Sequence, residues 1–578
     1  MWINLVETQA DIGHYSDPLL RFNRETTVIL SLYLTITCSS LTQTSGAASH
    51  SARRTTLATL AIYLLTTLLL DGSPAFATEP PGGPDDLTGT WLVEPQSPPG
   101  VAMIDTVSFE KGAKGISGKW NSRSNGPSAE LALIEISWHP PMLTFRFAGA
   151  PSGPIWKGSL IATDHLQLGF TASDGTVIQT RQLRRINRAE LAQLQADLPH
   201  DLITRPLPLP PLKDVPSNGL ALTPIMGWNS WNHFRQSVDD AAIRSMADAM
   251  GSSGLRAAGY VYVDIDDGWQ GRRDRQGILH PNSKFPDMKA LADYVHSKGL
   301  KLGIYNSPGP LSCAGYVGTH GFEAEDAKTF ASWGVDLLKY DWCSAGAIYK
   351  TQPQMQAVYQ KMGMALQASG RPIVYSLCQY GLFDVGRWGR KVGGNLWRTG
   401  GDTVEGARWD ALSSRFEEDG HAEDSGPGGW NDPDMMLIGN GGLTTEEYRT
   451  HMTLWVMLAA PLILGNDIRT MTPEVRSILL NSDVIAVDQD KLGKQGSRVI
   501  KEGTMEVWTK PLSDGSTAVA IFNRGDRLAN VDLKWSQLGL VDHQRVRDLW
   551  THSDAGVVGD YHGKLPSHGA TLLRVSTH

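Results

Sequence analysis

Short apolar runs alternate with amphipathic stretches along residues 221–490, and this alternation is the clearest pattern in the chain. The runs Tyr260–Ile265 and Val335–Tyr340 each follow a glycine and have the length of buried β-strands. Before the first run, apolar side chains recur at helical spacing between Ser237, a suitable helix cap, and Gly251, a suitable helix end. Repeated β–α units of this kind predict a (β/α)8 TIM barrel. A doubly wound open sheet is the alternative, but no glycine-rich phosphate loop opens the region.

Further helices of the predicted barrel are marked by their first residues. Thr444 and Glu447 have the spacing of a capping box for a helix over 445–460. Thr472 is followed by a proline, which favours a helix that begins at that point. Another helix is expected over 353–369.

All-β patterns flank the predicted barrel on both sides. Residues 80–200 contain short strand-like runs between turn residues, which predicts a small β-sandwich or barrel, either sugar-binding or purely structural. The proline-rich segment 201–220 is typical of a stiff linker. Alternating apolar positions return over 491–578 and predict an antiparallel C-terminal β-sandwich. The predicted fold is therefore α/β, with a catalytic TIM barrel over 221–490 between two all-β domains.

The first 77 residues have the features of a leader rather than of a folded domain. Arg53 and Arg54 precede an apolar run over 57–70, and small residues at 75–77 suit cleavage before Thr78. The apolar run is short for a transmembrane helix, which needs about 20 residues. We expect a signal peptide whose start is assigned too far upstream, with a true extension or membrane anchor as the alternative. The expected location is secreted or periplasmic, without a stable membrane partner.

Composition and charge narrow the class of protein. Hydrophobic residues make up 41% and charged residues 19% of the chain, which indicates a globular protein. The net charge of -8 gives no basic face for nucleic acid. Three of the four cysteines remain once the leader is removed. In an oxidising compartment Cys313 and Cys343 can pair and leave Cys378 free and buried, although Cys313 and Cys343 could instead be reduced core residues.

The run 335–340 leads directly into candidate chemistry. Asp341 follows it, with Lys339 two residues earlier. A nearby cation lowers the pKa of a carboxyl group, so Asp341 is expected to stay ionised and able to act as a nucleophile. A purely structural Lys–Asp pair is the alternative.

Other predicted strand ends carry acids, aromatic rings and two cations. Because catalytic residues of such barrels lie at the carboxyl ends of the strands, these side chains are expected to meet in one pocket. Paired carboxylates and a tryptophan suit a polyol, and two further acids can cleave a glycosidic bond. The candidates are Trp231, Asp266, Asp267, Tyr305, Lys339, Asp341, Gln379, Arg398, Asp402 and Asp434.

Each candidate also has a structural interpretation. Asp266 and Asp267 could form a surface turn or hold a metal, but carboxylates alone do not supply the 6–8 oxygen ligands of calcium. Asp402 follows two glycines and could cap a helix. Trp231 could belong to the core. The number of acids at strand ends is what favours a catalytic pocket.

Six motifs in this region resemble the α-galactosidases (melibiases) of glycoside hydrolase family 27, in the order and spacing of that family. The resemblance covers about 221–578. The motifs are Thr223–Asn232 (TPIMGWNSWN), Asp264–Trp269 (DIDDGW), Lys301–Tyr305 (KLGIY), Leu338–Cys343 (LKYDWC), Trp397–Asp402 (WRTGGD) and Gly429–Met435 (GWNDPDM).

The resemblance implies a retaining exo-glycosidase that needs no metal or other cofactor. It implies that Asp341 is the nucleophile and that Asp402, expected to have the higher pKa of the two, is the acid/base. Cys313 and Cys343 match a disulfide beside the pocket. The remaining matches are to sugar-binding positions: Trp231, Asp266, Asp267, Tyr305, Lys339, Arg398 and Asp434.

The segment Ser376–Gly381 (SLCQYG) departs from the Cys-Glu-Trp-Gly that plant-like members commonly carry. Gln379 and Tyr380 are expected to border the 2-position of the sugar and the exit toward the aglycone, so linkage and aglycone preference are affected. The predicted function is release of terminal α-D-galactose from oligosaccharides, polysaccharide side chains or glycoconjugates. The alternatives are an isomaltose-releasing or other α-glycosidase of the same family, and a non-catalytic carbohydrate-binding protein. No oligomeric state is predicted.

Overall fold

The computed structural model describes residues 86–94, 103–113, 115–124, 129–148, 155–171, 177–196, 202–403 and 408–577. The predicted leader, residues 1–77, lies outside these ranges. Within them, no helix has both the length and the apolar character needed to cross a membrane.

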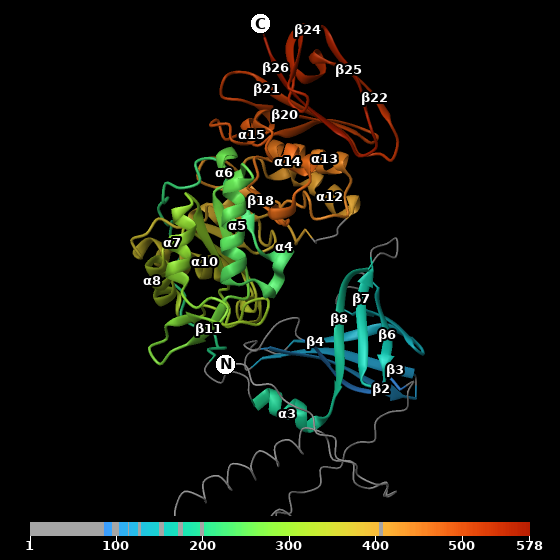
Figure 1. Cartoon of the computed structure of the whole chain (residues 1–578), viewed down its shortest axis with the longest axis vertical. Coiled ribbons are helices and arrows are strands. Elements are labelled where there is room, and N and C mark those ends of the chain that lie inside the picture. Colours follow the sequence, from blue (N-terminus) through green and yellow to red (C-terminus); the bar gives the residue numbers. More distant parts are fainter. Residues whose placement is uncertain are drawn as a thin grey trace, which may run out of the picture. The chain divides into compact units, whose positions relative to one another are not determined.

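Eight antiparallel strands near the N-terminus close into a barrel (Figure 1). Each strand pairs with the next along the chain, and the last strand pairs with the first. Trp91, Leu143, Phe145 and Leu168 are buried in its interior. The barrel is followed by helix α3 (Arg188–Ala196). Its strands are β1 (Gly89–Val93), β2 (Met103–Gly112), β3 (Gly115–Ser124), β4 (Ala129–His139), β5 (Met142–Phe147), β6 (Trp156–Ala162), β7 (His165–Thr171) and β8 (Val177–Ile186).

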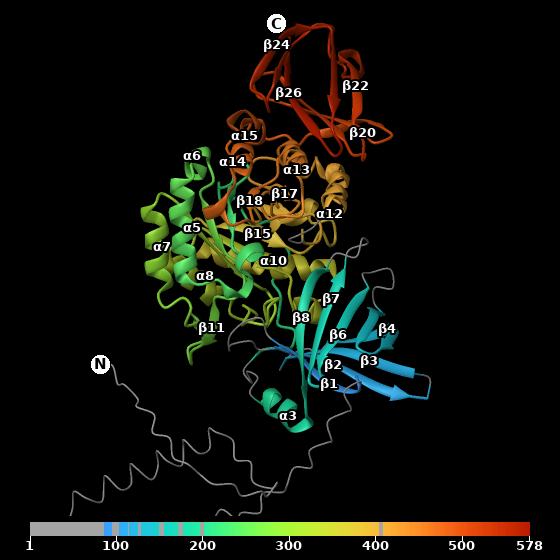
Figure 2. The same ribbon diagram turned by 45° about the vertical axis from the view of Figure 1, so that its right-hand side comes forward.

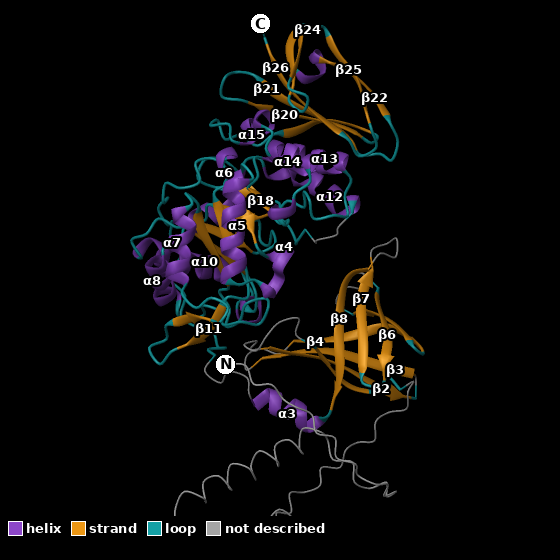
Figure 3. Ribbon diagram, viewed as in Figure 1, coloured by secondary structure: helices purple, strands orange, loops and turns teal. Residues whose placement is uncertain are grey.

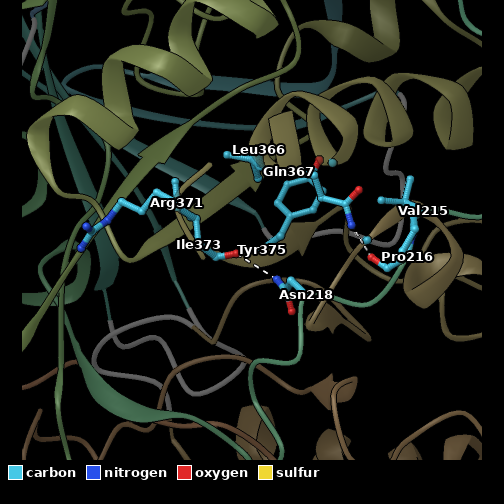
Figure 4. Close-up of a pocket in the computed structure, with 10 residues that line it drawn as sticks. Val215, Pro216, Asn218, Leu366, Gln367, Arg371, Ile373 and Tyr375 are labelled. Carbon is cyan, nitrogen blue, oxygen red and sulfur yellow. Dashed lines mark hydrogen bonds between the residues drawn. The ribbon is translucent and has the colours of Figure 1, made fainter. Parts of the chain in front are cut away.

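An extended segment from residue 202 leads into the second barrel and is hydrogen-bonded to it. The Lys213 N–H donates to Gln360 Oε1 at 2.8 Å, and Asn218 Nδ2 donates to the Ile373 carbonyl at 3.0 Å. Figure 4 shows a small pocket where this segment, at Val215 and Pro216, faces Ile373 and other residues at the start of a barrel strand. The proline-rich segment is thus attached along its length to the second barrel.

Eight parallel strands form the second barrel (Figure 2). Their order in the sheet is β17-β16-β15-β14-β13-β10-β9-β18. A parallel bridge between Met436 and Leu464 joins the two ends of this sheet, so the strands enclose a common interior as in a TIM barrel. The strands are β9 (Met226–Asn229), β10 (Tyr262–Ile265), β13 (Lys301–Asn306), β14 (Leu337–Asp341), β15 (Val374–Cys378), β16 (Leu396–Arg398), β17 (Trp430–Asp432) and β18 (Leu462–Leu464). A hairpin of β11 (Gln270–Arg273) and β12 (Leu279–Pro281) follows β10.

Helices surround the parallel strands, as Figure 3 shows by colour. Short 3-10 turns, η1 to η4, lie at Arg235–Ser237, Arg390–Val392, Ser414–His421 and Ile468–Thr470. The helices are α4 (Trp231–Phe234), α5 (Asp240–Ser252), α6 (Leu255–Ala258), α7 (Met288–Ser297), α8 (Glu323–Trp333), α9 (Ala345–Ile348), α10 (Gln352–Ala368), α11 (Gly386–Gly389), α12 (Trp409–Ser413), α13 (Thr445–Leu458), α14 (Pro473–Leu479) and α15 (Ser482–Asp488).

The predicted helix starts are confirmed in two cases and wrong in one. Thr444 and Glu447 form the capping box of α13, and Thr472 accepts from the Val475 N–H at the start of α14. Helix α5, however, is capped by Asp239 and not by Ser237, which lies in the turn η1. The backbone of Asp239 is extended, and its side chain accepts a hydrogen bond from the Ala242 N–H. An aspartate carboxylate caps a helix in this way as well as a serine hydroxyl does.

The C-terminal region is an antiparallel six-stranded sheet, β19-β20-β21-β26-β23-β24, with a two-stranded sheet of β22 and β25. It packs on the TIM barrel through α13, where Lys510 Nζ donates to the Val456 carbonyl at 2.7 Å and Thr450 Oγ1 donates to the His568 carbonyl at 2.6 Å. The turn η5 lies at Trp535–Leu538. The strands are β19 (Ser497–Glu502), β20 (Met505–Pro511), β21 (Thr517–Asn523), β22 (Ala529–Lys534), β23 (Gln544–Asp548), β24 (Ser553–Val558), β25 (Asp560–Leu565) and β26 (Ala570–Ser576).

Candidate active site

A pocket of about 270 Å³ lies at the carboxyl ends of the parallel strands. Eight of the ten sugar-site candidates line it, although they come from loops far apart in sequence. This volume is near the lower end of the range for ligand pockets, about 300–1,000 Å³, and suits one sugar ring better than a polymer chain. The lining candidates are Trp231, Asp266, Asp267, Tyr305, Lys339, Asp341, Asp402 and Asp434 directly, with Arg398 behind them in a smaller cavity that also touches Lys339 and Asp434.

Two adjacent carboxylates after β10 form a polar wall. Asp266 Oδ2 accepts from Lys339 Nζ at 2.7 Å and from Asn229 Nδ2 at 2.8 Å, so its charge is balanced. Asp267 Oδ2 accepts from the Ala314 N–H at 2.7 Å, while its Oδ1 has no partner among the described residues. Burial raises the pKa of Asp267 to about 7. A buried oxygen without a partner at a pocket wall is suited to a hydroxyl group of a ligand.

Asp341 ends β14 at the floor of the pocket and is only 6% exposed. Tyr380 Oη donates to its Oδ1 at 2.6 Å. Burial raises the pKa of Asp341 to about 6, although the charge of Lys339 and the hydrogen bond from Tyr380 both lower it. The predicted direction of this pKa shift was therefore wrong, because desolvation exceeds the effect of the lysine. The carboxyl group is still mostly ionised at neutral pH.

Asp402 lies at the rim, where its side chain is 62% exposed. Its Oδ1 accepts from Arg398 Nη2 at 3.0 Å, and Arg398 Nη1 is 3.0 Å from Asp434 Oδ1. Partial burial acts to raise the pKa of Asp402, but the positive charges of Arg398 and Lys339 lower it overall. The expectation that Asp402 has the higher pKa of the two acids is thus wrong for the protein without substrate. The reason is the ion pair with Arg398, which sequence spacing did not reveal.

Comparison with known proteins shows which family this chain resembles in sequence. A family model described as alpha galactosidase A matches residues 223–490, and one for the alpha galactosidase C-terminal beta sandwich domain matches 502–575. An α-galactosidase from Cyamopsis tetragonoloba is 47% identical over 363 residues, which cover 61% of this chain and 86% of that protein. The chain belongs to the α-galactosidases of glycoside hydrolase family 27.

Two solved structures of this family show how far the likeness extends. The α-galactosidase I of Mortierella vinacea aligns with a TM-score of 0.60 and 36% identity, covering 62% of this chain and 98% of that one. An α-galactosidase/melibiase homologue from Bacteroides fragilis aligns with the same TM-score and 32% identity, but it covers 85% of this chain and 98% of its own. The second likeness therefore includes residues outside the TIM barrel and C-terminal sheets.

The cysteines of this family member lie beside the nucleophile candidate. Cys313 and Cys343 form a disulfide with a Cα–Cα distance of 5.0 Å, and Cys378 is free and buried, as predicted. Oxygen of Asp341 and the two sulfurs lie within 4.8 Å of one another. Because both sulfurs are used in the disulfide, they are not thiolate ligands for a metal.

Gln379 is the candidate that lines neither this pocket nor the smaller cavity behind it. It is fully buried, its Nε2 donates to the Arg398 carbonyl at 3.2 Å, and its Oε1 has no partner among the described residues. Its role toward the 2-position of a sugar stays a prediction.

Several pocket residues were not among the sequence candidates. Met435 and Thr403 adjoin predicted positions but carry no charge or ring that signals chemistry. Arg235 could have been found, because it follows Trp231 by four residues and helical spacing places them together; its guanidinium lies 5.5 Å from the Trp231 ring centre. Tyr380 was expected, with Gln379, to border the sugar and the exit toward the aglycone, and it lines the pocket beside Asp341, but no contact with that carboxylate was predicted.

Proposed function

We propose that this protein is an exo-acting, retaining α-galactosidase that releases terminal α-D-galactose through a covalent intermediate on Asp341. The observation that carries the proposal is the arrangement of the pocket. A buried, hydrogen-bonded carboxylate lies at its floor, a second carboxylate lies exposed at its rim, and the volume accommodates one sugar ring. Membership of the α-galactosidase family supports galactose as the sugar released.

Two displacement steps account for the reaction. Asp341 attacks the anomeric carbon while Asp402, in its protonated form, donates to the departing glycosidic oxygen. Asp402 then removes a proton from water, which attacks the same carbon and frees Asp341. The rim position of Asp402 suits both roles, because the leaving group departs and water enters at the open side.

The pKa values suggest an acidic pH preference. Arg398 and Lys339 favour the charged form of Asp402, so the protonated form needed for the first step is a minority at neutral pH. Asp341 must be ionised, and because its pKa of about 6 lies above that of Asp402, it sets the alkaline side of the profile. The two acids titrate as an interacting pair, so the bell-shaped profile reports their joint behaviour.

Sugar recognition is assigned to the wall of the pocket. Asp266 and Asp267 would accept from the 4- and 6-hydroxyl groups, and Lys339 and Arg398 form ion pairs with Asp266 and Asp434 at the pocket. Trp231 would pack on the apolar face of the ring. Tyr305 and Asp434 complete the wall.

A secreted or periplasmic location is part of the proposal. It is supported by the disulfide between Cys313 and Cys343, which persists in oxidising compartments, and by the signal-like features of the leader.

Hydrolysis of four p-nitrophenyl glycosides by the 78–578 protein tests the proposal. The α-galactoside is compared with the α-glucoside, the α-N-acetylgalactosaminide and the β-L-arabinopyranoside, with Asp341→Ala as control. We expect turnover of the galactoside that is lost in the variant. Preference for another glycoside would indicate a different substrate and would favour an isomaltose-releasing or other α-glycosidase of the same family. Binding of galactose without turnover of any substrate would favour a non-catalytic carbohydrate-binding protein.

A further inference from the structure

Tyr380 is held in a fixed and unusual backbone conformation at the pocket. It follows β15 with a φ of 60°, in the left-handed region that non-glycine residues rarely adopt. The next N–H, of Gly381, donates to the Arg398 carbonyl at 3.1 Å. A Cβ atom at Gly381 would lie 2.3 Å from the Thr399 carbonyl oxygen, so the two strand ends are in close contact. Strained residues of this kind persist where the surroundings determine them, often at functional sites.

The side chain of Tyr380 is directed to the nucleophile candidate. Its Oη donates to Asp341 Oδ1 at 2.6 Å, and the sulfurs of Cys313 and Cys343 lie 3.6 and 3.9 Å from the same hydroxyl. The Arg398 guanidinium lies 5.8 Å from the centre of the ring. Burial and the charge of Asp341 raise the pKa of the Tyr380 phenol far above its usual value. The phenol therefore keeps its proton and donates it to the carboxylate.

Lys339 and Tyr380 both favour the ionised form of Asp341, but they do so differently. Lys339 Nζ is hydrogen-bonded to Asp266 Oδ2 at 2.7 Å, so its charge acts on Asp341 through space. Tyr380 contacts the Asp341 carboxylate directly. A hydrogen bond to one carboxylate oxygen also fixes the rotation of the group, which a charge at a distance does not.

We propose that Tyr380 is a positioning residue for the nucleophile, which holds Asp341 by Oδ1 and leaves Oδ2 as the oxygen that attacks the anomeric carbon. This inference rests on the proposed function of Asp341. In the first step the bond from carbon to Oδ2 forms, the glycosidic bond breaks, and the proton of Asp402 goes to the leaving oxygen. In the second step Asp402 removes a proton from water, the water oxygen bonds to the carbon, the bond from carbon to Oδ2 breaks, and Asp341 departs as a carboxylate.

The second step depends on Tyr380 more than the first does. As the carboxylate departs it regains negative charge, and the phenol hydrogen bond strengthens with that charge. Without the hydroxyl, the glycosyl-enzyme is hydrolysed more slowly and accumulates. The ionised form of free Asp341 also loses a stabilising partner.

The test compares Tyr380→Phe with Tyr375→Phe. Tyr375 is a suitable control because it is a buried tyrosine of β15 whose hydroxyl donates to the Tyr359 carbonyl at 3.1 Å and does not line the active-site pocket. We expect Tyr380→Phe to lower kcat on p-nitrophenyl α-galactoside about 10- to 100-fold, the loss expected for one charge-assisted hydrogen bond. Its pre-steady-state burst of p-nitrophenol should grow, and the alkaline limb of kcat/KM should move to higher pH. Tyr375→Phe should change neither the burst nor the limb.

A second measurement keeps the inference testable if Tyr380→Phe does not fold. Incorporation of 3,5-difluorotyrosine at position 380 keeps the shape and makes the phenol a stronger donor, so the alkaline limb should move to lower pH. The inference would be overturned if Tyr380→Phe kept the wild-type burst and the wild-type alkaline limb of the kcat/KM profile. It would also be overturned if the fluorinated residue left that limb unchanged. Either result would leave the proposed function intact. An inactive wild-type protein would instead overturn the proposed function, and this inference with it.

Discussion

The chain contains two eight-stranded barrels that differ in what they bury. The antiparallel barrel of β1 to β8 encloses apolar side chains such as Trp91 and Phe145. The parallel barrel encloses charged groups at one end, where Arg398 is 2% and Asp267 1% exposed. Antiparallel neighbours are joined by short hairpins, whereas each parallel strand must be followed by a crossover. The crossovers leave long loops at the carboxyl ends, and these loops supply the acids of the pocket.

This difference implies that function and stability are distributed unequally between the barrels. Buried charges are costly unless they are paired, so the parallel barrel maintains a network in which Lys339, Arg398 and their acids neutralise one another. In the part of the antiparallel barrel that the structure describes, the main buried cluster consists of apolar side chains. Variants in the two barrels should therefore have separable effects.

The largest effect is expected for Asp402→Ala. Loss of the acid/base should lower kcat about 10²- to 10⁴-fold for substrates with poor leaving groups. Azide should restore turnover of p-nitrophenyl α-galactoside and yield a galactosyl azide, because the small anion replaces water without base assistance. Absence of azide rescue, with the fold intact by circular dichroism, would argue against this role.

Ion pairs in the two barrels should differ in their contribution to stability. Lys339→Met leaves Asp266 buried without its cation and should lower the free energy of unfolding by about 3–5 kcal/mol. Arg146→Met removes a more exposed pair with Glu135, whose side chain is 64% exposed, and should cost less than about 1 kcal/mol. Denaturant unfolding of both variants checks the comparison, and equal losses would contradict it.

A core variant of the antiparallel barrel should separate stability from activity. Phe145→Ala removes a fully buried ring, and we expect a loss of about 3–5 kcal/mol in the unfolding of that barrel. kcat/KM on the small galactoside should stay at the wild-type level. A matching fall in kcat/KM would show that the antiparallel barrel contributes to the active site.

Acidification should stabilise the parallel barrel but not the antiparallel one. The folded-state pKa is about 7 for Asp264 and Asp267 and about 6 for Asp341 and Asp432, all above the usual 3.8. Between pH 7 and 5 the folded state thus binds more protons than the unfolded state, and stability rises as pH falls. Calorimetry should show the corresponding transition moving up by a few degrees. A downward shift over this range would contradict the assignment of these buried acids.

The architecture could be predicted because each type of strand leaves its own pattern. Buried parallel strands are continuous apolar runs, as at Leu337–Leu338, and strand ends carry the polar residues that follow. The pocket residues could be proposed from that rule together with the family motifs. The pattern also placed Thr444 and Thr472 correctly at helix starts.

The electrostatics could not be predicted, because they depend on distances that the sequence does not contain. Lys339 is two residues from Asp341 but forms its hydrogen bond with Asp266, which is 73 residues away. Arg398 and Asp402 are four residues apart, but the effect of their ion pair on the pKa of Asp402 depends on the burial of the arginine. Tyr380 was expected beside the sugar, but its hydrogen bond to Asp341 became apparent only in the structure.

Trapping of the covalent intermediate tests the central claim most directly. An activated 2-deoxy-2,2-difluoro-α-galactoside should slow both steps while its leaving group keeps the first step fast enough for the intermediate to accumulate. After proteolysis, mass spectrometry should find the difluorogalactosyl group on the peptide that contains Asp341, attached to that residue. A label on another residue, or no adduct together with inversion of the anomeric centre by NMR, would contradict the account.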